Sequence, residues 1–223
     1  MDIMHVNGLA FKARTATDWT LIGLSRSSVT ATIDIPEEIF GLKVTRVNAN
    51  AFKGNHSIEA VNFPQSINCI ETSAFENCTN LKYLFFKPGY EISNIQNRAF
   101  AGCSSLTSLT ILKPIMIHEE AFLNCTNLRA VDGNFMKIAN HAFYNCQLLH
   151  TVNVHSHVHI DTHAFDNCHR LSAINIIKDV SHSAEFVKYL QPQTAVHCCS
   201  DSKIADLAYE GCKIVTDMGL CKK

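Results

Sequence analysis

The sequence predicts a β-rich α/β solenoid, an elongated fold in which short repeated units stack along one axis. A segment that begins Ala-Phe occurs six times, and successive Phe residues lie 23, 25, 22, 21 and 22 positions apart. Each copy also carries apolar residues at fixed distances from its Phe, and some of them alternate as in a half-buried strand. Self-similarity at this period is typical of repeat architectures, in which each unit buries its core against its neighbours.

The repeat is defined by positions counted from its Phe. Ala74–Leu81 is a regular copy and reads AFENCTNL. A branched aliphatic residue precedes each Phe by five positions, and aliphatic or aromatic residues follow it at six, nine and, except at Gly133, eleven. The six Phe residues are Phe52, Phe75, Phe100, Phe122, Phe143 and Phe165. The alternation at nine and eleven predicts a short strand that points those two side chains into the core.

Residues 1–43 are expected to cap the N-terminal end of the core. Leu9–Arg14 and Trp19–Leu24 flank a polar connection, which predicts a hairpin with Trp19 as its anchor. Ile33–Pro36 matches the strand portion of a repeat that has no Ala-Phe of its own. Such irregularity is typical of terminal repeats, because one of their sides faces water.

The regular repeats are expected over residues 44–180. Pro88-Gly89 indicates a bulged loop in the longest repeat. Gly133 stands where the other repeats have an inward aliphatic or aromatic side chain, so we expect the weakest layer of the stack there.

Residues 181–223 are expected to form a C-terminal cap, which completes a single domain over 1–223. Ser181–Leu190 reads as a short helix ended by Gln191-Pro192, and Thr194–Cys199 as a strand. Ser202–Gly211 has helical apolar spacing, and Lys213–Thr216 reads as a closing strand.

These motifs resemble the BspA-like branch of the leucine-rich repeat family, whose units read approximately L-x-x-V-x-I-P…I-x-x-x-A-F-x-x-C. The match is continuous over about residues 29–178 and looser at both ends. The resemblance implies a right-handed leucine-rich-repeat solenoid with a parallel sheet along its concave side and a C-terminal helix-and-strand cap. It also implies adhesion and protein binding, in bacteria and parasitic protists, with no common enzymatic activity.

Composition excludes several classes of function. The formal net charge is −1 and no basic cluster occurs, so we expect no nucleic-acid partner. No apolar run reaches the roughly 18 residues of a membrane span. No signal peptide precedes the repeats, whereas the resemblance suggests a secreted or cell-surface protein, so localisation stays open. No phosphate-binding or hydrolase motif occurs, and we expect neither an enzyme nor a cofactor.

Half of the ten cysteines occupy one repeat position, three after the Phe. They are Cys78, Cys103, Cys125, Cys146 and Cys168. Stacked neighbours have Cβ atoms that do not converge, which favours buried free thiols over disulfides. For Cys198, Cys199, Cys212 and Cys221 a disulfide and free thiols both remain open.

The first candidate site is the row of side chains at eight, ten and twelve positions after each Phe, which should point outward on the concave face. Tyr83, Phe85 and Leu112 form an apolar group there, and exposed aromatics beside polar residues are typical binding anchors. The predicted binding residues are Tyr83, Phe85, Lys87, Thr110, Leu112, Asp132, Asn153, His155 and Asn175. Two alternatives to a binding site remain. The row is a solvated sheet face, or the loop at Lys87–Tyr90 covers the aromatic side chains.

The second candidate is a group of histidines near the end of the repeats. His157 and His159 flank Val158, so both should project from one face, and such a pair on a strand can bind a metal. No carboxylate has an assured position nearby, and plain surface histidines are the favoured interpretation, with no metal site.

The sequence therefore favours a non-enzymatic interaction or adhesion module that binds a protein, such as a host or cell-surface protein, or a glycan. The alternative is a structural spacer or a self-assembly module, and a histidine-rich metal-binding protein comes third. We expect a monomer or a weak homo-oligomer.

Overall fold

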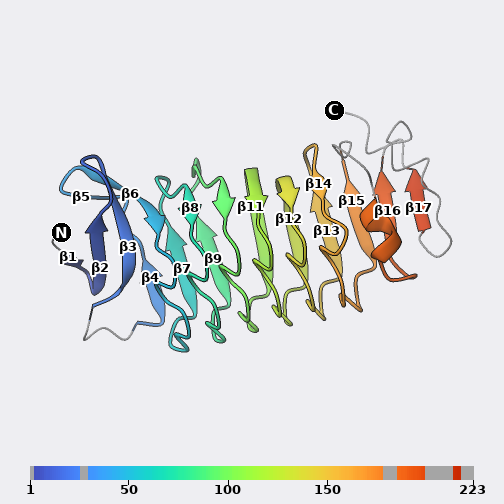
Figure 1. The fold of residues 1–223 in the computed structure, drawn as a ribbon, viewed down its shortest axis with the longest axis horizontal. Helices are drawn as coiled ribbons and strands as arrows, with labels where there is room; N and C mark the ends of the chain where they lie inside the picture. Colours follow the sequence, from blue (N-terminus) through green and yellow to red (C-terminus); the bar gives the residue numbers. More distant parts are fainter. Residues whose placement is uncertain (1–2, 26–29, 178–184, 199–212, 217–223) are drawn as a thin grey trace.

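The structure is a computed structural model that describes residues 3–25, 30–177, 185–198 and 213–216. Strands lie side by side along one long axis, and β1 and β17 lie at its opposite ends (Figure 1). The predicted β-rich solenoid is confirmed. No helix among the described residues is long and apolar enough to cross a bilayer.

The predicted strand of each repeat forms what we call the repeat-strand row. Its strands are β4 (Thr32–Asp34), β7 (Ala60–Phe63), β9 (Tyr83–Phe86), the first halves of β11 (Ser108–Ile117) and β12 (Ala130–Ile138), β13 (Thr151–Val154), β15 (Ala173–Ile176), β16 (Ala195–Cys198) and β17 (Lys213–Thr216). The pairings along this row are parallel, and they join equivalent positions of successive repeats, as in Val131 with Val152 and Val152 with Ile174. One β-strand per repeat therefore stacks in register.

A second row, the short-strand row, holds the branched aliphatic residue that precedes each Phe by five positions. It contains β8 (Cys69–Ile70), β10 (Asn94–Ile95), β14 (His159–Ile160) and the second halves of β11 and β12. Because β11 and β12 continue through both rows, they join the rows into one 14-stranded sheet, while β4, β7 and β9 form a separate three-stranded sheet. The sequence marked these aliphatic residues as core but did not predict that they form strands.

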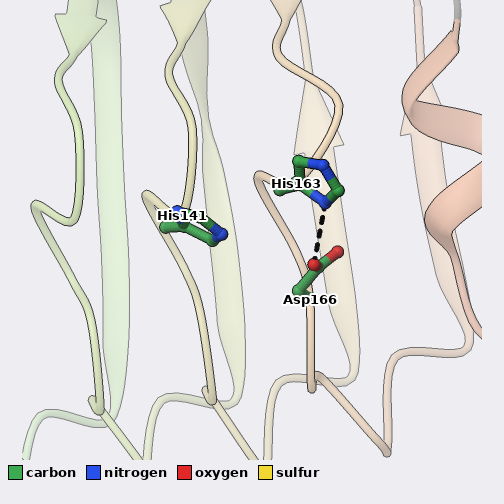
Figure 2. Close-up of side chains that lie close together, drawn as sticks. All are labelled: His141, His163 and Asp166. Atoms are coloured by element: carbon green, nitrogen blue, oxygen red, sulfur yellow. Dashed lines mark hydrogen bonds and ion pairs between the residues drawn. The ribbon is translucent and has the colours of Figure 1, made fainter.

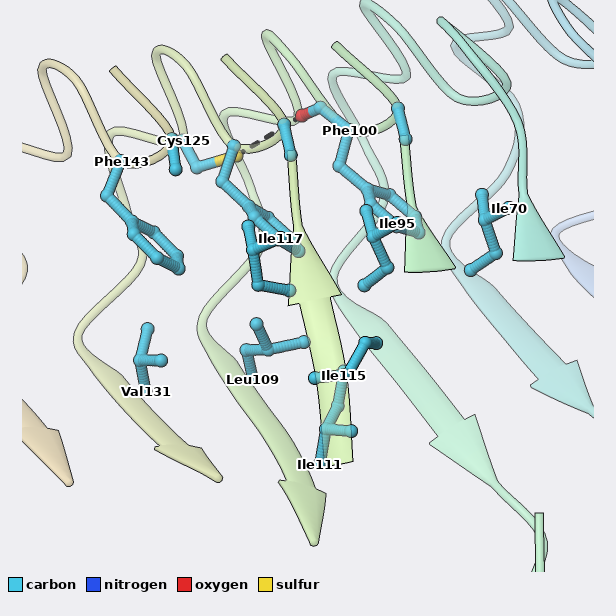
Figure 3. Packing of buried hydrophobic residues seen from close by; sticks show 14 of the residues in the cluster. Ile70, Ile95, Phe100, Leu109, Ile111, Ile115, Ile117, Cys125, Val131 and Phe143 are labelled. Carbon is cyan, nitrogen blue, oxygen red and sulfur yellow. Dashed lines mark hydrogen bonds between the residues drawn. The ribbon is translucent and has the colours of Figure 1, made fainter. Parts of the chain in front are cut away.

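The turns between the two rows carry the Ala-Phe motif, and their phenylalanines stack. Phe75, Phe100, Phe122 and Phe143 are fully buried, with neighbouring ring centroids 5.2–5.3 Å apart and ring planes within 11° of parallel. Figure 3 shows Phe100 and Phe143 beside the aliphatic side chains of both rows. One continuous apolar core thus runs through the repeats.

Five of the six turns place two residues in the left-handed region, and the turn of Phe165 places one. The residue two after the Phe is Asn or Gly in the repeats, with φ of 59° at Asn77 and 73° at Gly102, residue types that tolerate this conformation. Except at His163, the residue two before the Phe is also left-handed, with φ of 59° at Arg98 and 54° at His141. Backbone hydrogen bonds then lock adjacent turns together, such as Phe122 N to Ala142 O at 2.8 Å.

The predicted thiol column is present. All five cysteines of the repeat position are buried and free, and each donates a hydrogen bond from Sγ to the Phe carbonyl of the preceding repeat at 3.1–3.3 Å. Figure 3 marks this bond for Cys125 and Phe100. Burial raises the pKa of Cys78 to about 12 and raises that of Cys125 further. The thiols therefore act as small apolar groups that also satisfy a buried carbonyl.

Gly133 does not mark the weak layer that we expected. The fully buried ring of Phe135 fills the space, and a Cβ on Gly133 would lie 2.6 Å from Phe135 Cζ and 2.5 Å from the Ile111 carbonyl oxygen. The missing side chain is thus replaced by an aromatic ring from the same strand.

At the N-terminal end, the predicted hairpin is formed by β2 (Leu9–Ala13) and β3 (Asp18–Leu24). β1 (Ile3–Val6) adds an antiparallel strand, β3 pairs in parallel with β6 (Leu42–Val47), and β5 (Glu38–Ile39) folds back on β6. Trp19, the predicted anchor, is only half-buried and donates a hydrogen bond to the Ile39 carbonyl at 3.1 Å. The fully buried side chains of the hairpin are Phe11 and Leu21.

At the C-terminal end, a 3-10 helix, η1 (Glu185–Tyr189), lies within the predicted Ser181–Leu190 helix. β16 and β17 confirm the last two predicted strands and pair in parallel. The predicted helix at Ser202–Gly211 lies outside the described residues, as do Cys199, Cys212 and Cys221. Cys198 is buried.

Candidate functional site

The apolar group on the outward face of the repeat-strand row lies on β9 and β11. Tyr83, Phe85 and Leu112 have exposed fractions of 50%, 53% and 57%. The rings of Tyr83 and Phe85 stack along β9 with centroids 5.9 Å apart. Their alternating neighbours Leu84 and Phe86 pack against the core. We call Tyr83, Phe85 and Leu112 the aromatic patch.

The loop after β9 does not bury the aromatic patch. It brings Tyr90 against Phe86, with ring centroids 5.3 Å apart, and the Tyr90 hydroxyl accepts a hydrogen bond from Leu112 N at 2.5 Å. The covered ring is therefore that of Phe86. Lys87, at the rim of the patch, is exposed.

The repeat-strand row is divided beside the patch. β9 pairs with β7, but β9 and β11 form no ladder, although β11 is the next strand of the repeat-strand row. The insertion at Lys87–Tyr90 makes this repeat longer than its neighbours, which offsets the two strands. In the part of the chain that the structure describes, the edge of β9 that faces β11 therefore has no strand ladder of the kind found along the rest of the row.

The remaining predicted binding residues lie on later repeats, where polar side chains pair with one another. His155 Nε2 contacts Asp132 Oδ1, and Asn175 Nδ2 donates to Asn153 Oδ1 at 2.8 Å. Thr110 is exposed between this polar stretch and the patch. The predicted row thus divides into an apolar part and a part whose polar groups already have partners.

In the described part of the chain, His157 and His159 lie in different surroundings. His157 is exposed and lies before β14, whereas His159 is half-buried and its Nε2 lies 2.8 Å from Asp161 Oδ1. Neither belongs to a group of three ligand-bearing side chains among the described residues. No carboxylate had an assured position from the sequence, and the structure places Asp161 against His159.

A different set of polar side chains runs along the turns, at the position two before each Phe. Arg98, Glu120, His141 and His163 occupy this position in successive repeats. Arg98 contacts Glu120, and the imidazole centroids of His141 and His163 lie 5.6 Å apart. We call this set the turn column.

Side chains one position after the Phe extend the turn column. Glu76 Oε2 lies 2.8 Å from Lys53 Nζ, and its Oε1 lies 2.8 Å from Arg98 Nη2. Burial alone would raise the pKa of Glu76, but the hydrogen bonds from Lys53 and Arg98 outweigh it and lower this pKa to about 2. At the other end of the column, His163 Nδ1 lies 2.9 Å from Asp166 Oδ2 (Figure 2).

A hollow of about 380 Å³ lies beside the ends of β11 and β12 and is lined partly by His118, Lys137 and Asp161. Burial, with a smaller contribution from Lys137, lowers the pKa of His118. Two of the polar groups have close partners, with Lys137 Nζ 3.2 Å from Asp161 and His118 Nε2 3.1 Å from Asn94 Oδ1.

Comparison with protein-family models matches residues 27–134 and 93–216 to the "BspA type Leucine rich repeat region (6 copies)". Together these matches cover most of the chain. The chain belongs to the BspA-type leucine-rich repeat family. Leucine-rich repeat proteins of this kind are typically non-enzymatic and suited to protein interaction.

Solved structures share the fold of this BspA-type protein. A leucine-rich repeat protein from Bacteroides capillosus aligns with a TM-score of 0.52 at 23% identity, over 59% of this chain and 98% of its own. One from Bacteroides ovatus gives 0.55 at 17% identity, over 86% and 55% of the two chains. The leucine-rich repeat protein of T. pallidum gives 0.53 at 18% identity, over 87% and 81%. A comparison with curated proteins gives no significant match.

Sequence reasoning missed the turn column of this BspA-type protein. The signal was present, because aligning the repeats on their Phe places His141 and His163 at one position in consecutive units. The H-x-H pattern at His157 and His159 brings two side chains to one face only if the segment is a strand. His141 and His163 lie side by side because they are one whole repeat apart. A periodic fold brings together residues that share a repeat position.

Proposed function

We propose that this BspA-type repeat protein is a non-enzymatic interaction module that binds a partner through the aromatic patch, on the side of the solenoid that we expect to be concave. The preferred partner is another protein, such as a surface protein, and a glycan is the alternative. The whole chain then serves as a rigid scaffold that presents one face.

The observation that carries this proposal is the exposure of two stacked aromatic side chains at outward positions where the other repeats have Ala, Ser, Thr, Asn or Asp. The core does not require them, because Leu84 and Phe86 fill the inward positions of the same strand. Burying exposed apolar surface contributes roughly 25 cal/mol per Å². Aromatic side chains are also enriched among the residues that dominate binding energy.

The surroundings of the patch support a protein partner. Lys87 and Thr110 at its rim are exposed and offer a charge and a hydroxyl for orientation. The edge of β9 beside the patch has no ladder with β11, so backbone groups are available next to the aromatic anchors. An apolar centre with a polar rim is the usual anatomy of a protein interface.

The test is affinity capture from the native source, followed by direct measurement of binding to the captured partner. The Tyr83→Ala/Phe85→Ala variant is compared with wild type and with Phe40→Ala, which removes an exposed aromatic at the β5–β6 turn, 79% exposed and away from the patch. We expect the double variant to lose about 2 kcal/mol or more of binding energy, or roughly 30-fold in affinity, and Phe40→Ala to bind as wild type.

Equal capture by wild type and the double variant would contradict the proposal. If wild type binds a glycan on an array and the double variant does not, while no protein partner is captured, the partner is a glycan. Self-association that depends on Tyr83 and Phe85, measured by sedimentation, would favour the structural or self-assembly role.

A further inference from the structure

We propose that His141, His163 and Asp166, at one end of the turn column, bind a divalent transition-metal ion of the Zn²⁺ type. Their ligand atoms all lie within 4.8 Å of one another, and the three side chains are half-buried. Figure 2 shows them facing one another across two adjacent turns. This site is separate from the aromatic patch and does not depend on the proposed partner.

The donor set suits such an ion. Two imidazole nitrogens and one carboxylate oxygen are ligands that Zn²⁺ accepts, and a three-residue set leaves a position for water or a further ligand. Zn–ligand distances of about 2.0–2.2 Å place the donors of a tetrahedral site roughly 3.3–3.5 Å apart. His163 Nδ1 and Asp166 Oδ2, 2.9 Å apart, need to separate by only a few tenths of an ångström by this estimate. The ion would take the place of the proton that they share.

The His141 side chain can complete the site. Among the described residues its imidazole makes ring contacts, with His163 and with the edge of Tyr144 at 5.4 Å, and no hydrogen bond. Its nitrogens are therefore not committed to another group in this part of the structure. A side-chain rotation that brings one nitrogen toward His163 and Asp166 breaks no hydrogen bond.

The scaffold holds the ligands at a fixed spacing. Backbone hydrogen bonds join the two turns, from His141 N to His163 O at 3.2 Å, from Phe143 N to Ala164 O at 2.9 Å and from Asn145 N to Asp166 O at 2.9 Å. The Tyr189 ring of η1 packs edge-on against His163 at 4.4 Å. Rigid support of this kind lowers the cost of assembling a metal site.

A competing group shares His141 and adds Glu119 and Glu120. It has one imidazole instead of two, and the Glu120 carboxylate already pairs with Arg98. Asp166, by contrast, pairs with no Lys or Arg among the described residues. The borderline-soft character of Zn²⁺ favours the group that contains two imidazoles.

The experiment is a calorimetric titration of chelator-treated full-length protein with Zn²⁺ alone. We expect one ion per chain, and His141→Ala, His163→Ala and Asp166→Asn should each weaken binding at least about tenfold, the scale seen when support of a metal ligand is lost. The matched control is His157→Ala/His159→Ala, which removes two imidazoles outside the proposed ligand set and should bind as wild type. Circular dichroism confirms that each variant is folded.

Titration with Co²⁺ separates imidazole and carboxylate ligands from cysteine, because thiolate ligation adds intense charge-transfer bands in the near ultraviolet. A spectrum without those bands supports the site. Three results would overturn it: no saturable Zn²⁺ binding, unchanged affinity in His163→Ala, or an affinity loss in Glu120→Gln without one in His163→Ala.

Discussion

The stacked phenylalanines give the sharpest stability prediction, and Phe122 is the best position to test it. Its ring is fully buried between Phe100 and Phe143, with both centroid distances 5.3 Å and interplanar angles of 11° and 7°. Replacing a packed Phe by Ala costs about 3–5 kcal/mol through lost transfer energy and a residual cavity. Two ring contacts contribute about 0.5–1.5 kcal/mol each beyond burial, so we expect the upper part of that range for Phe122→Ala.

Two comparison variants calibrate this value. Phe52→Ala removes one described ring contact, with Phe75 at 5.0 Å, and should cost about 0.5–1.5 kcal/mol less than Phe122→Ala. Phe85→Ala removes a half-exposed ring on the outward face and should cost less than about 1 kcal/mol.

The assay is urea denaturation, followed by circular dichroism and by tyrosine and tryptophan fluorescence. Because repeats couple mainly to their neighbours, Phe122→Ala can separate the two probes into different transitions. A loss below about 1 kcal/mol for Phe122→Ala, or an equal loss for Phe85→Ala, would refute the stacked-ring account.

Three further predictions follow from the core and the turn column. The five cysteines of the thiol column should stay unreacted with a thiol reagent in the native protein, because they are buried and burial raises the pKa of Cys78 to about 12. Mass mapping of the unreduced protein should show no disulfide among them, and any such disulfide would contradict the column. Gly133→Ala should lower stability by about 1–3 kcal/mol in thermal unfolding, because its Cβ would overlap Phe135 and the Ile111 carbonyl, and a neutral result would show that the layer can relax. Glu76→Gln should destabilise the protein at neutral pH, because a lowered folded-state pKa contributes stability that is fully present above the unfolded pKa of 4.5. That contribution is lost as the pH falls toward the folded pKa of about 2, so the deficit of the variant should shrink over this range. The exposed Glu59–Lys82 pair is the control, and Glu59→Gln should change stability little at any pH.

The repeat positions could be predicted from sequence because each unit meets the same environment. An inward residue at nine or eleven after the Phe packs against the equivalent residues of the two neighbouring repeats. Val131, Val152 and Ile174 are therefore all aliphatic, and they pair in register. The same reasoning placed the cysteines in a buried column. The outward orientation of Tyr83 and Phe85 follows from the period of two along a strand.

What the sequence did not reveal lies in the parts that differ between repeats. Phe135 fills the space above Gly133 from a segment that has no fixed place in the repeat pattern. The pairing of His163 with Asp166, and of both with His141, depends on how consecutive turns stack one repeat apart and not on any local motif. At the N-terminal end, the choice of Phe11 and Leu21 over Trp19 as buried residues depends on how β2 and β3 meet β6.

The central proposal is that Tyr83 and Phe85 form a contact site for a partner and are not part of the core. The most direct measurement is a thermal unfolding curve of Tyr83→Ser/Phe85→Ser, recorded beside partner capture with the same protein. We predict a melting temperature close to that of wild type together with loss of capture, because both rings are about half exposed. A marked fall in melting temperature, or retained capture at an unchanged melting temperature, would contradict the proposal.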